Sequence, residues 1–206
     1  FFDKFIHFSC CLLGEFNSYN ALAAIAVATM HRASLEICKK ALEKVSVIPG
    51  RMEIVTRDPL VIVDYAHTPD QLESVYRALS GGFINHKSKI INQKLVCVLG
   101  SCGGGRDKWK RPVLGSIAQK YCKEIIITNE DPYDEDPLEI MEQIASGISS
   151  EAKPYYIVLD RKEAIKKALL LTNKDETAII TGKGSEPWMC LENGKKIPWS
   201  DKDVVK

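Results

Sequence analysis

Short apolar runs alternate with segments of helical periodicity along most of this chain. The apolar and β-branched runs predict strands at residues 52–56, 60–65, 94–99, 124–128, 155–159 and 177–181. Between them, apolar residues at helical spacing predict helices at residues 68–79, 112–121, 138–148 and 161–171. A closing hairpin is predicted at residues 189–191 and 195–197. Strands that alternate with crossover helices indicate an α/β fold with a mostly parallel sheet and flanking helices.

The first 49 residues carry a different pattern, which marks a domain boundary. Two helices are predicted at residues 20–29 and 34–45, and both are expected to face a core that this sequence does not include. Asn17 or Asn20 suits the N-cap of the first helix. The turn at Pro49 and Gly50 separates residues 1–49 from residues 50–206. Because the sequence opens on Phe1 inside an apolar pattern, we expect its N-terminus to be a cut edge.

Composition and charge narrow the range of partners. The chain has 206 residues, of which 45% are hydrophobic and 27% charged, as in an ordinary globular protein. Its net charge of +1 provides no overall basic field, so we expect neither nucleic acid nor membrane as a partner. The seven cysteines lack metal-like spacing, and we interpret them as reduced thiols. No segment resembles a signal peptide or a membrane span, so we expect a cytoplasmic protein.

A glycine-rich turn between a predicted strand and a predicted helix is the first candidate site. It reads Gly100-Ser-Cys-Gly-Gly-Gly-Arg-Asp-Lys-Trp-Lys-Arg-Pro112. Its glycines permit positive φ and close backbone approach, so that amide N–H groups can face an anion. The cations of the turn outnumber the carboxylate of Asp107; they are Arg106, Lys108, Lys110 and Arg111. We interpret the turn as an anion site, although glycine-rich turns also occur where nothing binds.

Polar residues also follow three other predicted strands. The carboxyl ends of parallel strands meet at one edge of a sheet, so these turns are expected to lie together. They contain Asp64, Tyr65, His67 and Asp70; then Glu130, Asp131, Tyr133 and residues 134–136; and finally Gly182, Lys183, Gly184, Ser185 and Glu186. Each turn alone is compatible with a solvated loop or a helix cap, which we favour for residues 134–136. As a set, the turns indicate a ligand site.

Five short motifs follow one another along the chain. They are Gly50-Arg-Met-Glu53, Asp64-Tyr-Ala-His-Thr-Pro-Asp70, Gly103-Gly-Gly-Arg-Asp-Lys-Trp-Lys-Arg-Pro112, Asp131-Pro with Glu135-Asp-Pro137, and Gly182-Lys-Gly-Ser-Glu186. In this order they resemble the Mur ligases, and within them the enzymes that add the third amino acid. The resemblance implies that residues 1–49 end the central ATPase domain and that residues 50–206 form the Rossmann-like C-terminal domain, which binds the amino acid.

The resemblance implies an ATP-dependent amide ligation in peptidoglycan biosynthesis, and hence a part in cell-wall formation, cell shape and cell division. ATP with Mg²⁺ phosphorylates the carboxylate of UDP-N-acetylmuramoyl-L-alanyl-D-glutamate, and a diamino acid attacks the acyl phosphate. That intermediate must be shielded from water, which favours a site that closes between two domains. We expect such a ligase to act as a monomer.

The resemblance also implies two sets of binding residues and, within this chain, neither a catalytic residue nor a metal ligand. On the ATP side, Asn17 and Asn20 match asparagines that lie near the adenine. Arg51 matches an arginine that reaches the phosphate, and Asp64 matches a carboxylate that binds the ribose. His67 either lies near the nucleotide or packs on a helix start. On the amino-acid side, Arg106 matches the clamp on the substrate carboxylate, Gly182 and Glu186 match the groups that receive the distal ammonium, and Asp131 and Tyr133 belong to the same pocket.

The sequence departs from the family pattern around this amino-acid pocket. Glu130-Asp131-Pro132-Tyr133 stands where diaminopimelate enzymes carry Asp-Asn-Pro-Arg, whose arginine grips the second carboxylate. A buried carboxylate without a cation is costly, so we expect L-lysine or a similar basic diamino acid rather than meso-diaminopimelate. Ser185 replaces the usual histidine of Gly-Lys-Gly-His-Glu, and Gly105 replaces an acidic residue, so the local geometry is expected to differ.

A further departure concerns the parts of the family that this sequence lacks. It contains no GxxxxGK[ST] phosphate loop, no counterpart of the carbamylated lysine and no domain for the UDP-sugar. We therefore expect a fragment of a longer ligase that is inactive alone. Two alternatives stay open: another amide ligase of the superfamily, such as a folylpolyglutamate or cyanophycin synthetase, and a nucleotide-binding α/β module without ligase chemistry.

Overall fold

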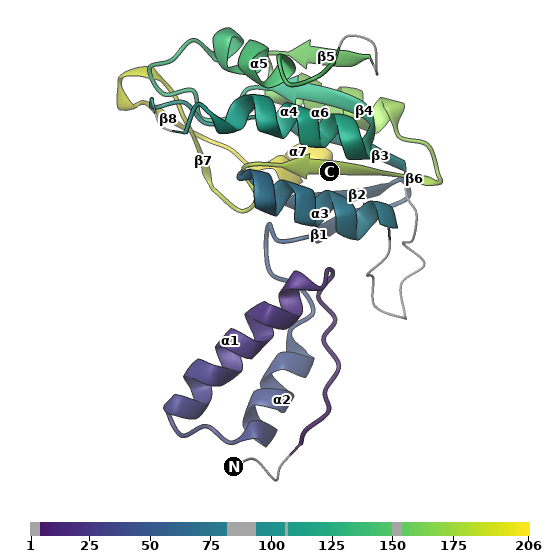
Figure 1. Ribbon diagram of the computed structural model, residues 1–206, viewed down its shortest axis with the longest axis vertical. Helices are drawn as coiled ribbons and strands as arrows, with labels where there is room; N and C mark the ends of the chain where they lie inside the picture. The colour runs from purple at the N-terminus through teal and green to yellow at the C-terminus, as the bar shows by residue number, and fades with distance from the viewer. Residues whose placement is uncertain (1–4, 82–93, 106, 150–153) are drawn as a thin grey trace.

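The computed structural model describes residues 5–81, 94–105, 107–149 and 154–206, which form a helical hairpin followed by an α/β domain (Figure 1). The two units meet at the turn around Gly50, where the predicted boundary lies. Within the described residues no helix is long and apolar enough to cross a membrane.

The helical hairpin contains α1 (Phe16–Met30) and α2 (Leu35–Lys44). Ser34 caps α2, because its hydroxyl accepts the N–H of Ile37 at 3.3 Å. The prediction that Asn17 or Asn20 caps α1 is wrong: the helix begins earlier, so both asparagines lie inside it, and Glu15 takes the cap position without a side-chain bond.

Both helices of the hairpin expose large apolar side chains. These are Tyr19, Leu22, Val27, Met30 and Ile37, each 59–83% exposed. Large exposed apolar side chains that gather on one unit of a soluble protein are typical of an interaction face. That a further domain covers these residues stays a prediction, and the exposure supports it.

The α/β domain is built on a six-stranded sheet in the order β1-β2-β6-β3-β4-β5. The strands are β1 (Glu53–Arg57), β2 (Leu60–Asp64), β3 (Lys94–Leu99), β4 (Cys122–Thr128), β5 (Tyr155–Val158) and β6 (Glu176–Thr181). Only β1 is antiparallel to its neighbour among these strands. The predicted mostly parallel sheet is therefore confirmed, with ends that differ by one or two residues.

Helices cover both faces of the sheet. On one face lie α3 (Pro69–Gly81), α4 (Lys110–Tyr121) and α5 (Pro137–Ala145); on the other lie α6 (Arg161–Leu171) and α7 (Asp201–Val205) (Figure 1). Each face buries its own apolar cluster, because successive side chains of a strand point to opposite sides. The central strand β6 is buried along its whole length.

The chain ends in a small hairpin and the short helix α7. β7 (Trp188–Cys190) pairs antiparallel with β8 (Lys196–Pro198), which confirms the predicted hairpin. Asn193 takes a left-handed conformation (φ 57°) in the connecting turn. Helix α7 was not predicted: it begins where the Ser200 hydroxyl accepts the N–H of Asp203 at 3.2 Å.

A disulfide joins Cys97 of β3 to Cys122 at the start of β4. The interpretation of the cysteines as reduced thiols is therefore wrong for this pair. Neighbouring strands bring the two Cα atoms to 6.0 Å, within the range of a disulfide. A separation of 25 residues between them hides this proximity from the sequence.

A buried ion pair fastens α7 to the carboxyl edge of the sheet. The Arg161 guanidinium binds both carboxylate oxygens of Asp201 at 2.8 Å. It also donates to the carbonyl of Thr181 at 2.9 Å and to that of Asn129 at 3.2 Å, where β6 and β4 end. Both charged side chains are shielded from solvent, so every one of these bonds forms in a region of low dielectric.

Glu130 is a second buried charge at this edge. It is fully enclosed directly after β4, and its Oε2 atom has no hydrogen-bond partner among the described residues. Burial raises the pKa of this carboxyl to about 7, while Arg161 nearby works in the opposite direction. A Cβ atom on Gly182 would lie 2.1 Å from Oε2 at a φ of 111°, so a larger residue there would be strained and would displace Glu130.

We predict that Arg161→Met lowers the free energy of unfolding by about 3–5 kcal/mol, because it leaves Asp201 buried without a counter-charge. Urea denaturation followed by circular dichroism measures the loss. Lys166→Met is the control: it removes an ion pair with Glu163 whose side chains are 50% and 58% exposed, so its cost should stay below about 1 kcal/mol. Equal losses in the two variants would contradict the structural role of Arg161.

We predict that the protein loses stability as the pH rises from about 4.5 to about 7, because Glu130 must ionise in its enclosed position. A pKa raised from 4.5 to about 7 adds stability below 4.5 that disappears between the two values. Each pKa unit corresponds to about 1.4 kcal/mol, so the loss is on the order of 3 kcal/mol. Urea denaturation at several pH values measures it.

Glu130→Gln should reduce this pH dependence and leave the part that comes from the raised pKa of Asp64, whereas Glu163→Gln, which changes an exposed carboxylate, should keep it in full. A Glu130→Gln variant that follows the wild-type pH profile would show that another group is responsible.

Candidate functional site

Most of the predicted site residues that the structure describes lie at the carboxyl edge of the sheet, in two groups, and the second group includes the turn that follows β6. The strand order also changes direction here, because the chain returns from β5 to place β6 between β2 and β3. In open α/β sheets, ligands bind at such a switch point.

The first group lines a cavity of about 570 Å³ between the start of α1, the Gly50 turn, the end of β2 and the start of α3. We call it the α1 cavity. Its lining residues are Phe16, Asn17, Asn20, Ile48, Arg51, Asp64, Ala66, Asp70, Gln71, Ser74 and Val75. Four of the residues assigned to ATP from the sequence are among them: Asn17, Asn20, Arg51 and Asp64. His67, the fifth, is not.

Asp64, at the end of β2, lines the α1 cavity. Its Oδ2 accepts the N–H of Met52 and its Oδ1 that of Ala66, both at 2.7 Å. Burial raises the pKa of this carboxyl, and the two amide bonds oppose that rise. Each carboxylate oxygen has a further lone pair, so the side chain can also accept from a ligand hydroxyl. Asp64 therefore fixes two turns in addition to any role toward a ligand.

The two asparagines form a polar ladder on α1. The Asn17 amide donates to the Leu13 carbonyl at 2.6 Å, and its Oδ1 accepts from Asn20 at 3.0 Å. Asn17 is buried and Asn20 exposed, so Asn17 orients the side chain that faces the open part of the cavity. An amide offers both donors and an acceptor, which suits recognition of a purine edge.

Arg51 supplies the cation of the α1 cavity. Its guanidinium lies 4.4 Å from the centre of the Tyr65 ring, in cation–π geometry. His67 packs edge-on against the same ring, with the two ring centres 4.7 Å apart, and its Nδ1 lies 2.9 Å from the Tyr65 carbonyl. His67 thus packs on Tyr65, and its role near the nucleotide stays a prediction.

The second group is an ion cluster centred on Lys183, which we call the Lys183 cluster. The ammonium lies 2.7 Å from Oδ2 of Asp131 and 2.7 Å from Oε2 of Glu186. Burial disfavours the charged forms of Lys183 and Glu186, but hydrogen bonds outweigh it. The bonds from Lys183 and Tyr65 lower the pKa of Glu186, and the bonds to Asp131 and Glu186 raise the pKa of Lys183. Lys183 and Glu186 therefore stay ionised at neutral pH.

Lys183 received no role from the sequence, and the structure shows why it matters. Asp131 accepts both Lys183 and the N–H of Cys190, at 2.7 Å each, so its two oxygens are already engaged. A ligand ammonium at Asp131 or Glu186 would share these carboxylates with Lys183. The signal was present in the motif Gly182-Lys-Gly-Ser-Glu186, but sequence spacing does not reveal which acid a lysine meets.

Tyr133 borders this cluster from the turn after β4. It adopts a left-handed backbone conformation (φ 52°), and its ring lies over Gly104. The side-chain hydrogen bond with Cys190, together with partial burial, raises the pKa of Tyr133 to about 12. The side chain is therefore neutral at physiological pH and adds no cation to the site.

The glycine turn binds an anion that belongs to the protein itself. Glu135 Oε1 accepts the N–H of Gly105 at 2.6 Å, and its carboxylate pairs with Arg111 at 3.1 Å and Lys108 at 3.0 Å. The Arg111 hydrogen bonds lower the pKa of Glu135 to about 2. The expectation that these cations face a ligand is therefore wrong for Arg111 and Lys108. Arg106 lies outside the described residues.

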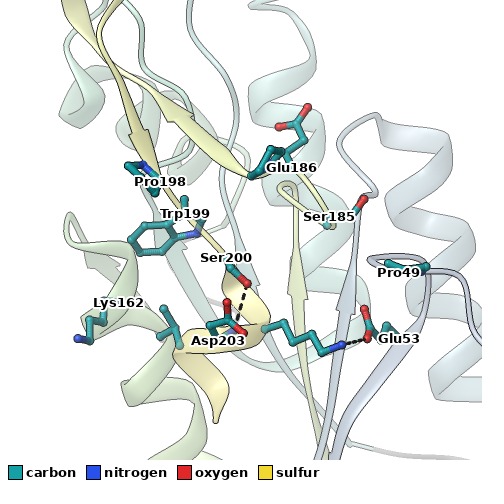
Figure 2. A pocket seen from close by; sticks show the side chains of 13 residues that line it. Pro49, Glu53, Lys162, Ser185, Glu186, Pro198, Trp199, Ser200 and Asp203 are labelled. Atoms are coloured by element: carbon teal, nitrogen blue, oxygen red, sulfur yellow. Dashed lines mark hydrogen bonds and ion pairs between the residues drawn. The ribbon is translucent and has the colours of Figure 1, made fainter.

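A larger cavity of about 900 Å³ lies beside α7 (Figure 2). Its labelled residues include Glu53, Lys162, Trp199 and Asp203, and it also touches Ser185 and Glu186. In Figure 2 the Glu186 carboxylate points away from Trp199, and Glu53 is already paired with Lys202. Among the assigned site residues that the structure describes, Glu186 alone lines this cavity.

The described residues show no group of three or more His, Cys, Asp or Glu side chains that could hold a metal ion. The α1 cavity is lined by polar groups of several kinds. Amide, carboxylate and guanidinium groups converge on it, and its volume is within the usual range for cofactor pockets.

Comparisons with known proteins agree with this geometry. The family model described as "Mur ligase, glutamate ligase domain" matches residues 50–184. A relative from Aquifex aeolicus, named UDP-N-acetylmuramoyl-L-alanyl-D-glutamate--2,6-diaminopimelate ligase, is 42% identical over 100% of this chain and 40% of its own length. The chain therefore spans two fifths of the length of that relative.

Solved structures show the same fold. A structure of a ligase with that same name superposes with a TM-score of 0.68 at 32% identity, over 96% of this chain and 39% of its own. A Mycobacterium tuberculosis folylpolyglutamate synthase complexed with ADP and AMPPCP has a TM-score of 0.65 at 21% identity, over 84% of this chain and 38% of its own, which indicates a shared fold. With its sheet topology, its five ordered motifs and these relatives, the chain belongs to the Mur ligase family.

Proposed function

We propose that this chain is the C-terminal part of an ATP-dependent ligase that adds a diamino acid to UDP-N-acetylmuramoyl-L-alanyl-D-glutamate. The observation that carries the proposal is the convergence of Asn17, Asn20, Arg51 and Asp64 on one cavity beside the Lys183 cluster. A nucleotide site next to an ion cluster is what an enzyme needs to bring an activated carboxylate and an amine together. The name of the Aquifex aeolicus relative supports the same acceptor.

In this proposal the α1 cavity holds ATP. Asn20 contacts the base, Asp64 accepts from a ribose hydroxyl, and Arg51 reaches toward phosphate, where a guanidinium fork binds oxygens in pairs. ATP phosphorylates the acceptor carboxylate to an acyl phosphate, and the amine then displaces phosphate. Because the described residues contain no metal cluster, any Mg²⁺ would be held by phosphate oxygens and by residues beyond them.

The Lys183 cluster forms the amino-acid side of the proposed site. Glu186 and the carbonyl of Gly182 receive the distal ammonium of the diamino acid, next to Asp131 and Tyr133, and Arg106 clamps its α-carboxylate. We further propose that the ligase acts in the cytoplasm as a monomer whose upstream domains cover the exposed faces of α1 and α2.

The charges around this cluster favour L-lysine as the amino acid. The carboxylates of Asp131 and Glu186 outnumber the cation of Lys183, so an added ammonium completes the balance. A second substrate carboxylate would meet the neutral Tyr133, while Arg161 and Arg111 are already paired with Asp201 and Glu135. Burying that carboxylate without a cation would be costly.

We predict that the longer protein containing this chain uses L-lysine at least 10-fold more efficiently than meso-diaminopimelate, judged by kcat/KM. The factor corresponds to one unpaired charge at a cost of about 1.4 kcal/mol or more. The assay supplies ATP, UDP-N-acetylmuramoyl-L-alanyl-D-glutamate and both amino acids, and follows the tripeptide product by mass spectrometry.

Tyr133→Arg should reverse this preference because it supplies the missing cation, whereas Tyr155→Arg, on an exposed edge strand, should leave it unchanged. A wild-type protein that prefers diaminopimelate would contradict the lysine assignment and leave the ligase intact. Product formation only with a folate acceptor would favour the folylpolyglutamate-type alternative instead.

We predict that Arg51→Met raises the KM for ATP by about 10-fold or more, since a hydrogen-bonded ion pair with phosphate contributes roughly 1.5–3 kcal/mol. Steady-state kinetics with varied ATP measures the change. Arg57→Met is the matched control, because Arg57 is exposed at the far end of β1. Similar KM values for ATP in both variants would show that Arg51 does not reach the nucleotide.

A further inference from the structure

Tyr65 stands between the α1 cavity and the Lys183 cluster and contacts both. The Arg51 guanidinium lies over its ring at 4.4 Å. Its hydroxyl donates to Oε1 of Glu186 at 2.8 Å, while Oε2 of the same carboxylate accepts from Lys183 at 2.7 Å. One side chain thus makes a specific contact with each group of site residues.

The backbone around Tyr65 is packed as tightly as its side chain. A Cβ atom on Gly50 would lie 2.2 Å from the Ser185 nitrogen, and one on Gly184 would lie 2.7 Å from Cβ of Tyr65. The N–H of Gly182 donates to the carbonyl of Asp64 at 3.2 Å. The three turns therefore interlock, and a displacement of one must displace the others.

The hydroxyl of Tyr65 is held in its donor state. The bond to Glu186 raises the pKa of Tyr65, so the proton stays on the phenol at physiological pH. With Tyr65 on one oxygen and Lys183 on the other, the carboxylate of Glu186 has a fixed orientation. Removing either donor would let it rotate toward solvent, since the side chain is 40% exposed.

We propose that Tyr65 is a positioning residue that couples the two half-sites: its ring orients Arg51 toward the nucleotide, and its hydroxyl orients Glu186 toward the incoming amino acid. The inference rests on the proposed function and adds a residue to which that function gives no role. Ring and hydroxyl act on different substrates, so substitutions can separate them.

The test compares Tyr65→Phe and Tyr65→Leu in the longer protein, by steady-state kinetics with each substrate varied in turn. Tyr65→Phe keeps the ring and loses the hydroxyl, so the KM for the amino acid should rise about 10-fold while the KM for ATP changes less than about 2-fold. Tyr65→Leu loses both contacts, so the KM for ATP should also rise, by about 2- to 5-fold.

Tyr121→Phe is the matched control. It removes the same kind of bond, from a tyrosine hydroxyl to Glu73 at 2.9 Å, on the α3–α4 surface away from both groups of site residues. It should leave both KM values unchanged. Melting temperatures of the three variants, measured in parallel, separate loss of stability from loss of positioning.

The outcomes distinguish this inference from the function on which it rests. Suppose that the wild-type protein ligates normally. If Tyr65→Phe then behaves like Tyr121→Phe, or raises both KM values equally, the coupling role of Tyr65 is overturned and the proposed function stands. A wild-type protein that ligates no amino acid overturns the proposed function and this inference with it.

Discussion

The close packing of the turn after β6 is the constraint on which the rest of this structure depends. β6 lies at the centre of the sheet, between β2 and β3, so its turn must pass between the turns of its neighbours. Gly182 leaves room for the enclosed carboxyl of Glu130, and Gly184 leaves room for Tyr65. Without side chains at these two positions, the strand ends approach closely enough for Lys183 to meet Asp131, which follows β4, and for Tyr65, which follows β2, to meet Glu186.

Much of the fold and the general location of the site could be predicted from the sequence, because both depend on local patterns. Apolar runs that alternate with segments of helical periodicity predict the sheet, and in a parallel sheet the turns that follow the strands all lie at one edge. The motif that begins at Asp64 and the one that begins at Gly182 therefore met where they were expected. The start of α1 was misplaced because an asparagine near a helix start suits a cap, but its side chain can also donate to a backbone carbonyl four residues earlier, as Asn17 does to Leu13.

The partners of the charged side chains could not be predicted in the same way. Lys183 meets an acid 52 residues earlier in the chain, and Arg111 meets one 24 residues later. Several carboxylates in each turn are equally plausible partners until the fold fixes distances, and the disulfide between β3 and β4 depends on strand register in the same manner. Helix α7 was missed for a related reason: its short segment carries little periodicity, and a buried arginine on α6 holds it in place.

The internal ligand of the glycine turn has a consequence for selectivity. A carboxylate tethered to its own binding site has a high effective concentration, so a small dissolved anion competes with it poorly. Inorganic phosphate, acetate or a stray amino acid would therefore find Arg111 and Lys108 occupied by Glu135. Glu135 thus excludes small free anions from the glycine turn, and a ligand can displace it only with binding energy from other contacts in the site.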